Sequence, residues 1–269
     1  MEMIRLNTGV KIPLIGTGTN TFGKKDRRYD AEITGDTSEL EAAIAAGYRL
    51  IDTAISYRNE AVIGQAVKKS GIAREAFFIT SKLPGRPEYT ASRENVEAGI
   101  AYSLAQLETE YIDLYLIHHP WEDLDEIVSV WEVLEEAVDQ GQLRAIGVSN
   151  FDETQLQYLI DHSRIKPSVN QVQSHVGHWN HEVIAFGKQH GIVSEAWGPL
   201  SNVSDEARAK LTEIGKPYNK TWAQVSLRYQ TQLGIVVIPK SHHPGRQKDN
   251  LDLFSFTLTA AEMAEIATL

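Results

Sequence analysis

The stretch Gly47-Tyr-Arg-Leu-Ile-Asp-Thr-Ala54 joins the end of a helix to a short strand that carries a carboxylate. The glycine that opens it ends a helical pattern marked by Leu40 and Ile44, which follows the N-cap cluster Asp36-Thr37-Ser38. The apolar run Arg49–Thr53 then predicts a strand. A helix that returns directly into a strand with a polar carboxyl end is the repeating unit of an α/β protein.

The same alternation extends in both directions along the chain. We expect eight strands, at Leu14–Gly18, Arg49–Thr53, Ala76–Ser81, Ile112–Ile117, Ala145–Ser149, Ser168–Gln173, Ile192–Ala196 and Ile235–Ile238. Helical apolar stripes lie between several of them, at Val96–Leu107, Ile127–Val138 and Leu156–Ile160. Before the first strand, Ile4–Pro13 turns at Asn7-Thr8-Gly9 and predicts a β-hairpin.

The spacing of the strands selects the architecture. Gly18 and Lys240 are 222 residues apart, and seven steps over that distance take about 32 residues each, the size of one βαβ unit. No linker or shift of composition divides the chain. We therefore expect residues 1–269 to form one domain of the α/β class, a (β/α)8 TIM barrel with an N-terminal β-hairpin.

Composition and charge exclude several functions. Hydrophobic residues make up 42% of the chain, enough for a sizeable core. The net charge of −10 opposes binding to nucleic acid and to anionic membranes. The absence of cysteine excludes disulfides, thiolate metal sites and a cysteine nucleophile. No apolar run approaches the roughly 18 residues of a membrane span. We expect a cytoplasmic monomer that acts on a small molecule.

Polar residues cluster where the predicted strands end. Active sites of (β/α)8 barrels form at the carboxyl ends of the strands, so these residues are the candidates for chemistry. In chain order they are Thr19, Asp52, Lys82, His118, Ser149, Asn150, Gln171, Lys240 and Ser241, and the seventh strand delivers Trp197. A polar group from almost every strand at one rim indicates a site.

Asp52, Lys82 and His118 form a set suited to proton transfer when Tyr57 is added to them. Tyr57 follows Asp52 by five residues. A free tyrosine has a pKa of about 10, and a neighbouring ammonium such as that of Lys82 would lower it. Asp52 would keep that ammonium charged, and His118 would orient a substrate oxygen. The alternative is a structural Asp52–Lys82 ion pair beside a passive loop tyrosine. The occurrence of all four at successive strand ends favours catalysis.

Longer motifs carry a family resemblance over essentially the whole chain. They are Gly-Tyr-Arg-Leu-Ile-Asp-Thr-Ala at 47–54, Asp-Leu-Tyr-Leu-Ile-His at 113–118, Ala-Ile-Gly-Val-Ser-Asn-Phe at 145–151 and Ile-Pro-Lys-Ser at 238–241. Together they resemble the signatures of the aldo-keto reductases, and the chain looks like a short bacterial-type member. The resemblance implies an NADPH-dependent oxidoreductase that reduces aldehydes or ketones on a barrel.

The resemblance also implies a role for each matching residue. Tyr57 would be the general acid, Lys82 and Asp52 its tuning pair, and His118 the orienting residue. The coenzyme would be held by Thr19 near the nicotinamide ribose, by Ser149, Asn150 and Gln171 at the carboxamide, by Trp197 against the nicotinamide ring, by Lys240, Ser241 and Arg246 at the 2′-phosphate, and by Asp249 and Asn250 near the adenine.

Charge supports the phosphate assignment independently. Residues 240–248 contain Lys240, Arg246, Lys248 and two histidines but no acid, in a protein of net charge −10. A solvated helix start is the alternative. Phosphate sites of barrels gather after the seventh and eighth strands, which favours an anion site here.

Several departures from the family pattern bear on the substrate. Asn20 and His119 stand where tryptophan is frequent, and Val176-Gly177 replaces a common Pro-Tyr. The chain ends at Leu269, where relatives often carry a longer closing loop. We expect an open, polar-tolerant pocket lined by Asn20, His118 and His119, and a small polar aldehyde, ketose or dicarbonyl as substrate.

Two other functions compete with this interpretation. One is a non-catalytic regulatory barrel that binds NADPH. The other is a class I aldolase that forms a Schiff base on Lys82, which would require a desolvated, neutral lysine. A metal site is not expected. His118 and His119 would point to opposite sides of a strand, and no carboxylate pattern completes the set of His175, His178 and His181.

Overall fold

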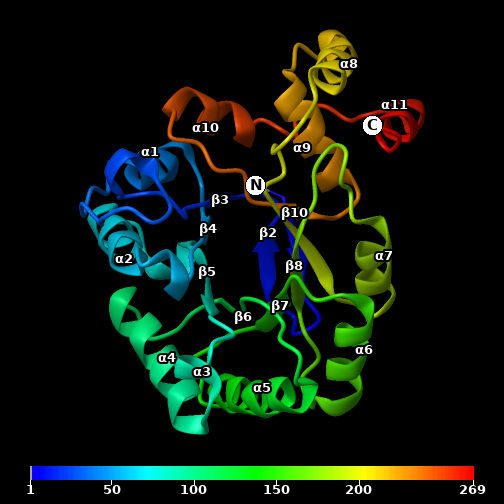
Figure 1. The fold of residues 1–269 in the computed structure, drawn as a ribbon. Helices are drawn as coiled ribbons and strands as arrows, with labels where there is room; N and C mark the ends of the chain where they lie inside the picture. The colour runs from blue at the N-terminus through cyan, green and yellow to red at the C-terminus, as the bar shows by residue number, and fades with distance from the viewer. Residues whose placement is uncertain (1) are drawn as a thin grey trace.

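The computed structural model describes residues 2–269 and is a barrel of parallel strands surrounded by helices (Figure 1). Within these residues, one eight-stranded sheet holds β3 (Gly16–Gly18), β4 (Leu50–Asp52), β5 (Phe78–Leu83), β6 (Leu114–Ile117), β7 (Ile146–Ser149), β8 (Val169–Gln173), β9 (Val193–Trp197) and β10 (Val236–Val237). Each strand pairs in parallel with its neighbours in chain order. A parallel bridge between Ile15 and Val237 joins the first strand to the last and closes the barrel.

Helices cover the outside of this ring (Figure 1). In chain order they are α1 (Ser38–Ala46), α2 (Glu60–Lys69), α3 (Pro87–Thr90), α4 (Arg93–Gln106), α5 (Leu124–Asp139), α6 (Glu153–His162), α7 (His181–Gln189), α8 (Asp205–Gly215), α9 (Trp222–Gln232), α10 (Pro244–Leu251) and α11 (Ala260–Ile266). Gly47 ends α1 with a φ of 118°, a left-handed conformation that glycine adopts without strain. This glycine is what turns the chain directly into β4.

The two-residue period of the strands separates two apolar layers. In β4, Leu50 belongs to a cluster inside the barrel, whereas Ile51 belongs to the larger cluster between the strands and the helices. The inner cluster also includes Ile12 and Leu14, which come from the end of the hairpin of β1 (Met3–Arg5) and β2 (Lys11–Pro13). The hairpin therefore closes the amino end of the barrel, and the carboxyl end is left for polar groups.

The predicted fold is confirmed in its main features. All eight predicted strands and the N-terminal hairpin are present. The fifth strand in the chain, β5, starts and ends two residues later than predicted, so Lys82 lies inside it rather than beyond its end. No helix in residues 2–269 is long and apolar enough to cross a membrane.

We expect Ile12→Ala to destabilise the protein by about 2–5 kcal/mol, because the substitution leaves a cavity in the apolar cluster where the hairpin closes the amino end of the barrel. Ile12 is fully buried, whereas Met3, in the same hairpin, is 46% exposed. Met3→Ala is the matched control and should change stability by no more than about 0.5 kcal/mol. Urea denaturation of both variants measures the difference. Equal stability losses would contradict a closing role for the hairpin.

Candidate active site

An ion pair between Lys82 and Asp52 lies at the centre of the barrel interior. Lys82 is 0% and Asp52 2% exposed. The Lys82 Nζ donates to both Asp52 carboxylate oxygens, at 2.8 and 2.6 Å, and to the Thr53 carbonyl at 2.9 Å. Adjacent strands supply the two side chains, since Asp52 on β4 is paired in register with Thr80 on β5. The ammonium is thus fixed and stripped of water.

Tyr57 lies directly above this pair. It ends the short 3₁₀ turn Ile55–Tyr57 that follows β4, and its hydroxyl accepts a hydrogen bond from Lys82 Nζ at 3.3 Å. Lys82 does act to lower the pKa of Tyr57, as predicted, but other effects outweigh it. Burial raises the pKa of Tyr57 to about 12, since the opposing effect of Lys82 is smaller and Asp52 adds to the rise. Tyr57 is therefore fully protonated at neutral pH.

His118 packs against Tyr57, with ring centroids 5.6 Å apart in an edge-on arrangement. Burial, and then the Lys82 ammonium, lower the pKa of His118 to about 2, so its imidazole is neutral. The expectation that His118 and His119 point to opposite sides is wrong. Strand β6 ends at Ile117, and beyond it the two rings stack 4.3 Å apart. Both face one cavity.

A second polar group lies on β7, β8 and β9. Ser149 Oγ donates to the Gln171 carbonyl at 3.0 Å, and Asn150 Nδ2 donates to Ser149 Oγ at the same distance. Trp197 Nε1 donates to Asn150 Oδ1 at 2.8 Å. Asn150 has a φ of 62°, a left-handed conformation that asparagine tolerates better than most residues. These contacts fix hydroxyl, amide and indole groups on one wall.

A cavity of about 510 Å³ brings most of the predicted residues together. Its lining includes Thr19, Asn20, Asp52, Tyr57, His118, His119, Ser149, Asn150, Gln171, Trp197 and Lys240. Thr19 is tied to the end of β4, because its hydroxyl donates to the Asp52 carbonyl at 2.7 Å. Lys82 does not line the cavity itself, but it contacts the Tyr57 hydroxyl, which does.

Tyr29 also lines this cavity and was not predicted. Its ring meets Tyr57 edge-on at 6.0 Å, and Lys24 Nζ lies 4.6 Å from its ring centroid. The side chain is held in place because Lys24 and Arg58 both donate to the Tyr29 backbone carbonyl. A bulky aromatic in the long polar segment between β3 and α1 was the available signal. Tyr29 partly replaces the aromatic surface that Asn20 and His119 lack.

A second cavity, of about 590 Å³, lies at the start of α10 and shares Leu200 and Lys240 with the first. Its lining holds the other residues predicted for the phosphate and adenine, Ser241, Arg246, Asp249 and Asn250, together with Arg208 and Trp222. The guanidinium of Arg208 lies 5.1 Å from the Trp222 ring, and neither residue was singled out in the sequence. Within the described residues, neither Lys240 nor Arg246 is part of an ion pair, so both charges are available to an anion.

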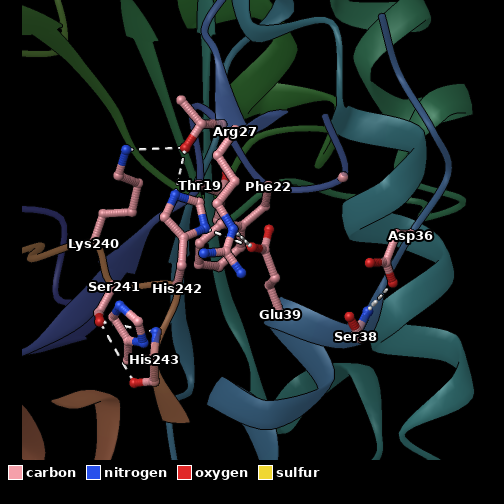
Figure 2. A network of polar contacts seen from close by, with 12 residues as sticks. Thr19, Phe22, Arg27, Asp36, Ser38, Glu39, Lys240, Ser241, His242 and His243 are labelled. Carbon is pink, nitrogen blue, oxygen red and sulfur yellow. Dashed lines mark hydrogen bonds and ion pairs between the residues drawn. The ribbon is translucent and has the colours of Figure 1, made fainter. Parts of the chain in front are cut away.

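Figure 2 shows Lys240 and His242, which follow the last strand, beside Glu39 of α1 and Arg27. Lys240 Nζ donates to Thr21 Oγ1 at 2.9 Å, and the same hydroxyl contacts His242 Nε2 at 3.0 Å. The other ring nitrogen of His242 lies 2.5 Å from Glu39, which pairs with Arg27 at 3.0 Å. One chain of contacts thus runs from Lys240, which lines both cavities, to Arg27, two residues before Tyr29 in the sequence.

The charge of Lys82 bears on the alternative prediction of a Schiff-base aldolase. Burial alone would lower the pKa of Lys82, but Asp52, with Tyr57 and Glu195, outweighs burial and raises it. A lysine held charged in this way is a poor Schiff-base nucleophile. In residues 2–269, no three His, Asp or Glu side chains are placed to hold a metal ion.

Comparison with known families agrees with this geometry. A model described as the Aldo/keto reductase family matches residues 14–269. The chain belongs to the aldo-keto reductase family. It is an NADPH-dependent oxidoreductase that acts on carbonyl groups, so the predicted family, enzyme class and coenzyme are confirmed.

Individual relatives cover almost the whole chain. The glyoxal reductase of Bacillus subtilis is 39% identical over 268 residues, which are 100% of this chain and 92% of the relative. A Brucella melitensis aldo/keto reductase structure superposes with a TM-score of 0.90 at 35% identity, over 99% of this chain and 98% of that one. A Bombyx mori aldo-keto reductase solved in complex with NADP has a TM-score of 0.87 at 32% identity, with 99% and 92% covered.

We expect Lys82→Met to destabilise the protein by about 3–5 kcal/mol, because it leaves the Asp52 carboxylate buried without its partner. Lys68→Met is the matched control, since it removes an exposed lysine paired with Glu108 and should change little. Thermal and urea denaturation measure both variants. A Lys82→Met protein as stable as Lys68→Met would show that Asp52 is not held charged by Lys82.

Proposed function

We propose that the chain reduces the carbonyl group of small polar aldehydes, ketoses or dicarbonyls, with Tyr57 as the general acid. One observation carries this proposal: the Tyr57 hydroxyl lies 3.3 Å from a buried ammonium, beside the neutral His118, on the wall of the 510 Å³ cavity. A protonated phenol, a fixed cation and a hydrogen-bonding imidazole around one point suit the protonation of a developing alkoxide.

The donor groups of the two cavities suit NADPH. Amide and hydroxyl groups of Ser149, Asn150 and Gln171 match a carboxamide, and Trp197 offers a flat ring beside them. Lys240 and Arg246, free of ion pairs within the described residues, match the 2′-phosphate, with Ser241 beside them and Asp249 and Asn250 at the adenine. Bound there, the coenzyme would supply the hydride for the carbonyl carbon.

The chain's own residues would then manage the proton. Tyr57 gives its phenolic proton to the carbonyl oxygen, so its O–H bond breaks as the product O–H bond forms. The phenolate that remains is stabilised by Lys82, whose charge is maintained by Asp52. His118, neutral because the pKa is held at about 2, donates a hydrogen bond to the same oxygen without delivering a proton.

The substrate class follows from the lining of the pocket and from a relative. Asn20, His119 and Asn150 give the cavity polar walls, and Tyr29 gives it one aromatic side. The B. subtilis relative is named a glyoxal reductase. We propose small dicarbonyls as the first substrates to test, in an NADPH-consumption screen that also contains ketoses and bulky aromatic aldehydes.

Tyr57→Phe should abolish turnover while NADPH binding stays nearly unchanged, because only the proton donor is removed. Loss of a general acid lowers kcat by about 10²–10⁴-fold. Steady-state kinetics with a dicarbonyl, together with fluorescence titration of NADPH, separate the two effects. Turnover at the wild-type rate would refute the assignment of Tyr57.

Arg246→Ala should weaken NADPH binding far more than NADH binding, since only NADPH carries the 2′-phosphate. We expect about a tenfold or larger rise in the Kd for NADPH, the usual effect of losing a charge-assisted contact. Lys248→Ala is the matched control, because Lys248 lies on the same helix but does not line the second cavity. An equal effect of Arg246→Ala on both coenzymes would exclude the phosphate contact.

A further inference from the structure

Glu195 is a buried carboxyl group that the proposed reaction does not use. It lies on β9 in the middle of the barrel interior, is 0% exposed, and is paired in register with Gln171 on β8. Its Oε1 accepts a hydrogen bond from Gln171 Nε2, and its Oε2 has no partner in residues 2–269. An acid buried this deeply destabilises a fold unless its contacts offset the loss of water.

The nitrogen of Gln171 makes two contacts that fix its orientation. It lies 2.9 Å from Asp52 Oδ2 and also donates to Glu195 Oε1. Asp52 is ionised, because both of its oxygens accept from Lys82, so it can only accept a hydrogen bond from Gln171. The atom between the two carboxyl groups must therefore be the NH₂ group of Gln171. Its carbonyl end is left for the cavity that Gln171 lines.

We infer that Glu195 is a positioning residue of the coenzyme site. With Asp52 it binds both N–H groups of Gln171, so this side chain offers the nicotinamide carboxamide an acceptor and no donor. The inference rests on the proposed function, because it assumes that Gln171 meets that carboxamide. If Glu195 has this role, it makes the site selective for coenzymes whose nicotinamide ring substituent carries an N–H donor.

The charge state of Glu195 agrees with this role. Burial, and then the Asp52 carboxylate, raise the pKa of Glu195 to about 8, with Gln171 and Lys82 opposing the rise. The acid is therefore neutral at neutral pH and becomes an anion as the pH passes that value. Asp52 on β4 and Lys82 on β5 are the charged groups that act on it, and the neighbouring residue of β10 is Val236.

The test compares NADPH with its reduced 3-acetylpyridine analogue, in which an acetyl group replaces the carboxamide and has no N–H. Wild-type protein should bind the analogue about tenfold more weakly, because the Gln171 carbonyl then lacks a donor. In Glu195→Met, only the Asp52 contact still holds the NH₂ group of Gln171, so one N–H is released toward the acetyl oxygen and the ratio of the two Kd values should fall. Glu195→Gln retains the acceptor and should keep the wild-type ratio.

Glu195→Gln also provides a readout that does not depend on the folding of Glu195→Met. In wild type, the anion formed above a pH of about 8 should tighten NADP⁺ relative to NADPH, since it favours the cationic ring. Over the same range Tyr57 stays protonated, with a pKa of about 12, and the raised pKa of Lys82 keeps its ammonium charged. Glu195→Gln should abolish this pH dependence.

Three results would overturn the inference. They are equal affinity of wild type for NADPH and the analogue, an unchanged ratio in a folded Glu195→Met, and a pH dependence that persists in Glu195→Gln. Failure of the proposed function gives a different result, because a wild-type protein that bound no NADPH would fail before any variant is compared.

Discussion

The Lys82–Asp52 ion pair is the constraint on which the rest of the site depends. An ion pair that is almost completely buried is stable only if good geometry and further hydrogen bonds offset the lost hydration. Here the ammonium is saturated by two carboxylate oxygens, a backbone carbonyl and the Tyr57 hydroxyl. Asp52 takes a further hydrogen bond from Gln171. The contacts that stabilise the pair therefore also place the Tyr57 phenol on one side of it and the Gln171 amide on the other.

The charge balance inside the barrel follows from the same pair. Two carboxyl groups and one ammonium share the interior, and burial disfavours a second anion, so Glu195 remains protonated at neutral pH with a pKa of about 8. Burial, with a smaller contribution from the Asp52 charge, outweighs the effect of Lys82 and keeps the pKa of Tyr57 above its ordinary value. In the proposed reaction, Tyr57 would give up its proton only as the substrate oxygen develops charge, and Lys82 would stabilise the phenolate.

The periodic part of this structure could be predicted, and the less regular part could not. Strands such as Ile112–Ile117 and the stop at Gly47 follow from patterns that burial and backbone geometry impose. The stacking of His118 on His119 was missed because both residues lie beyond the end of β6 at Ile117, where strand alternation no longer applies. Tyr29 reaches the cavity through loop contacts that no local pattern encodes. Glu195 was visible as an acid within an apolar strand, but its meaning required the position of Gln171, distant in sequence.

One set of contacts links Lys240, in the proposed coenzyme site, to the segment between β3 and α1. Lys240, at the junction of the two cavities, shares the Thr21 hydroxyl with His242, and His242 reaches Glu39 at the start of α1 (Figure 2). Glu39 in turn pairs with Arg27, two residues before Tyr29. A protein of net charge −10 has thus gathered cations around a small number of carboxylates at this edge. Arg27 and Lys240 therefore belong to one chain of contacts, which fixes the start of α1 relative to the segment that follows β10.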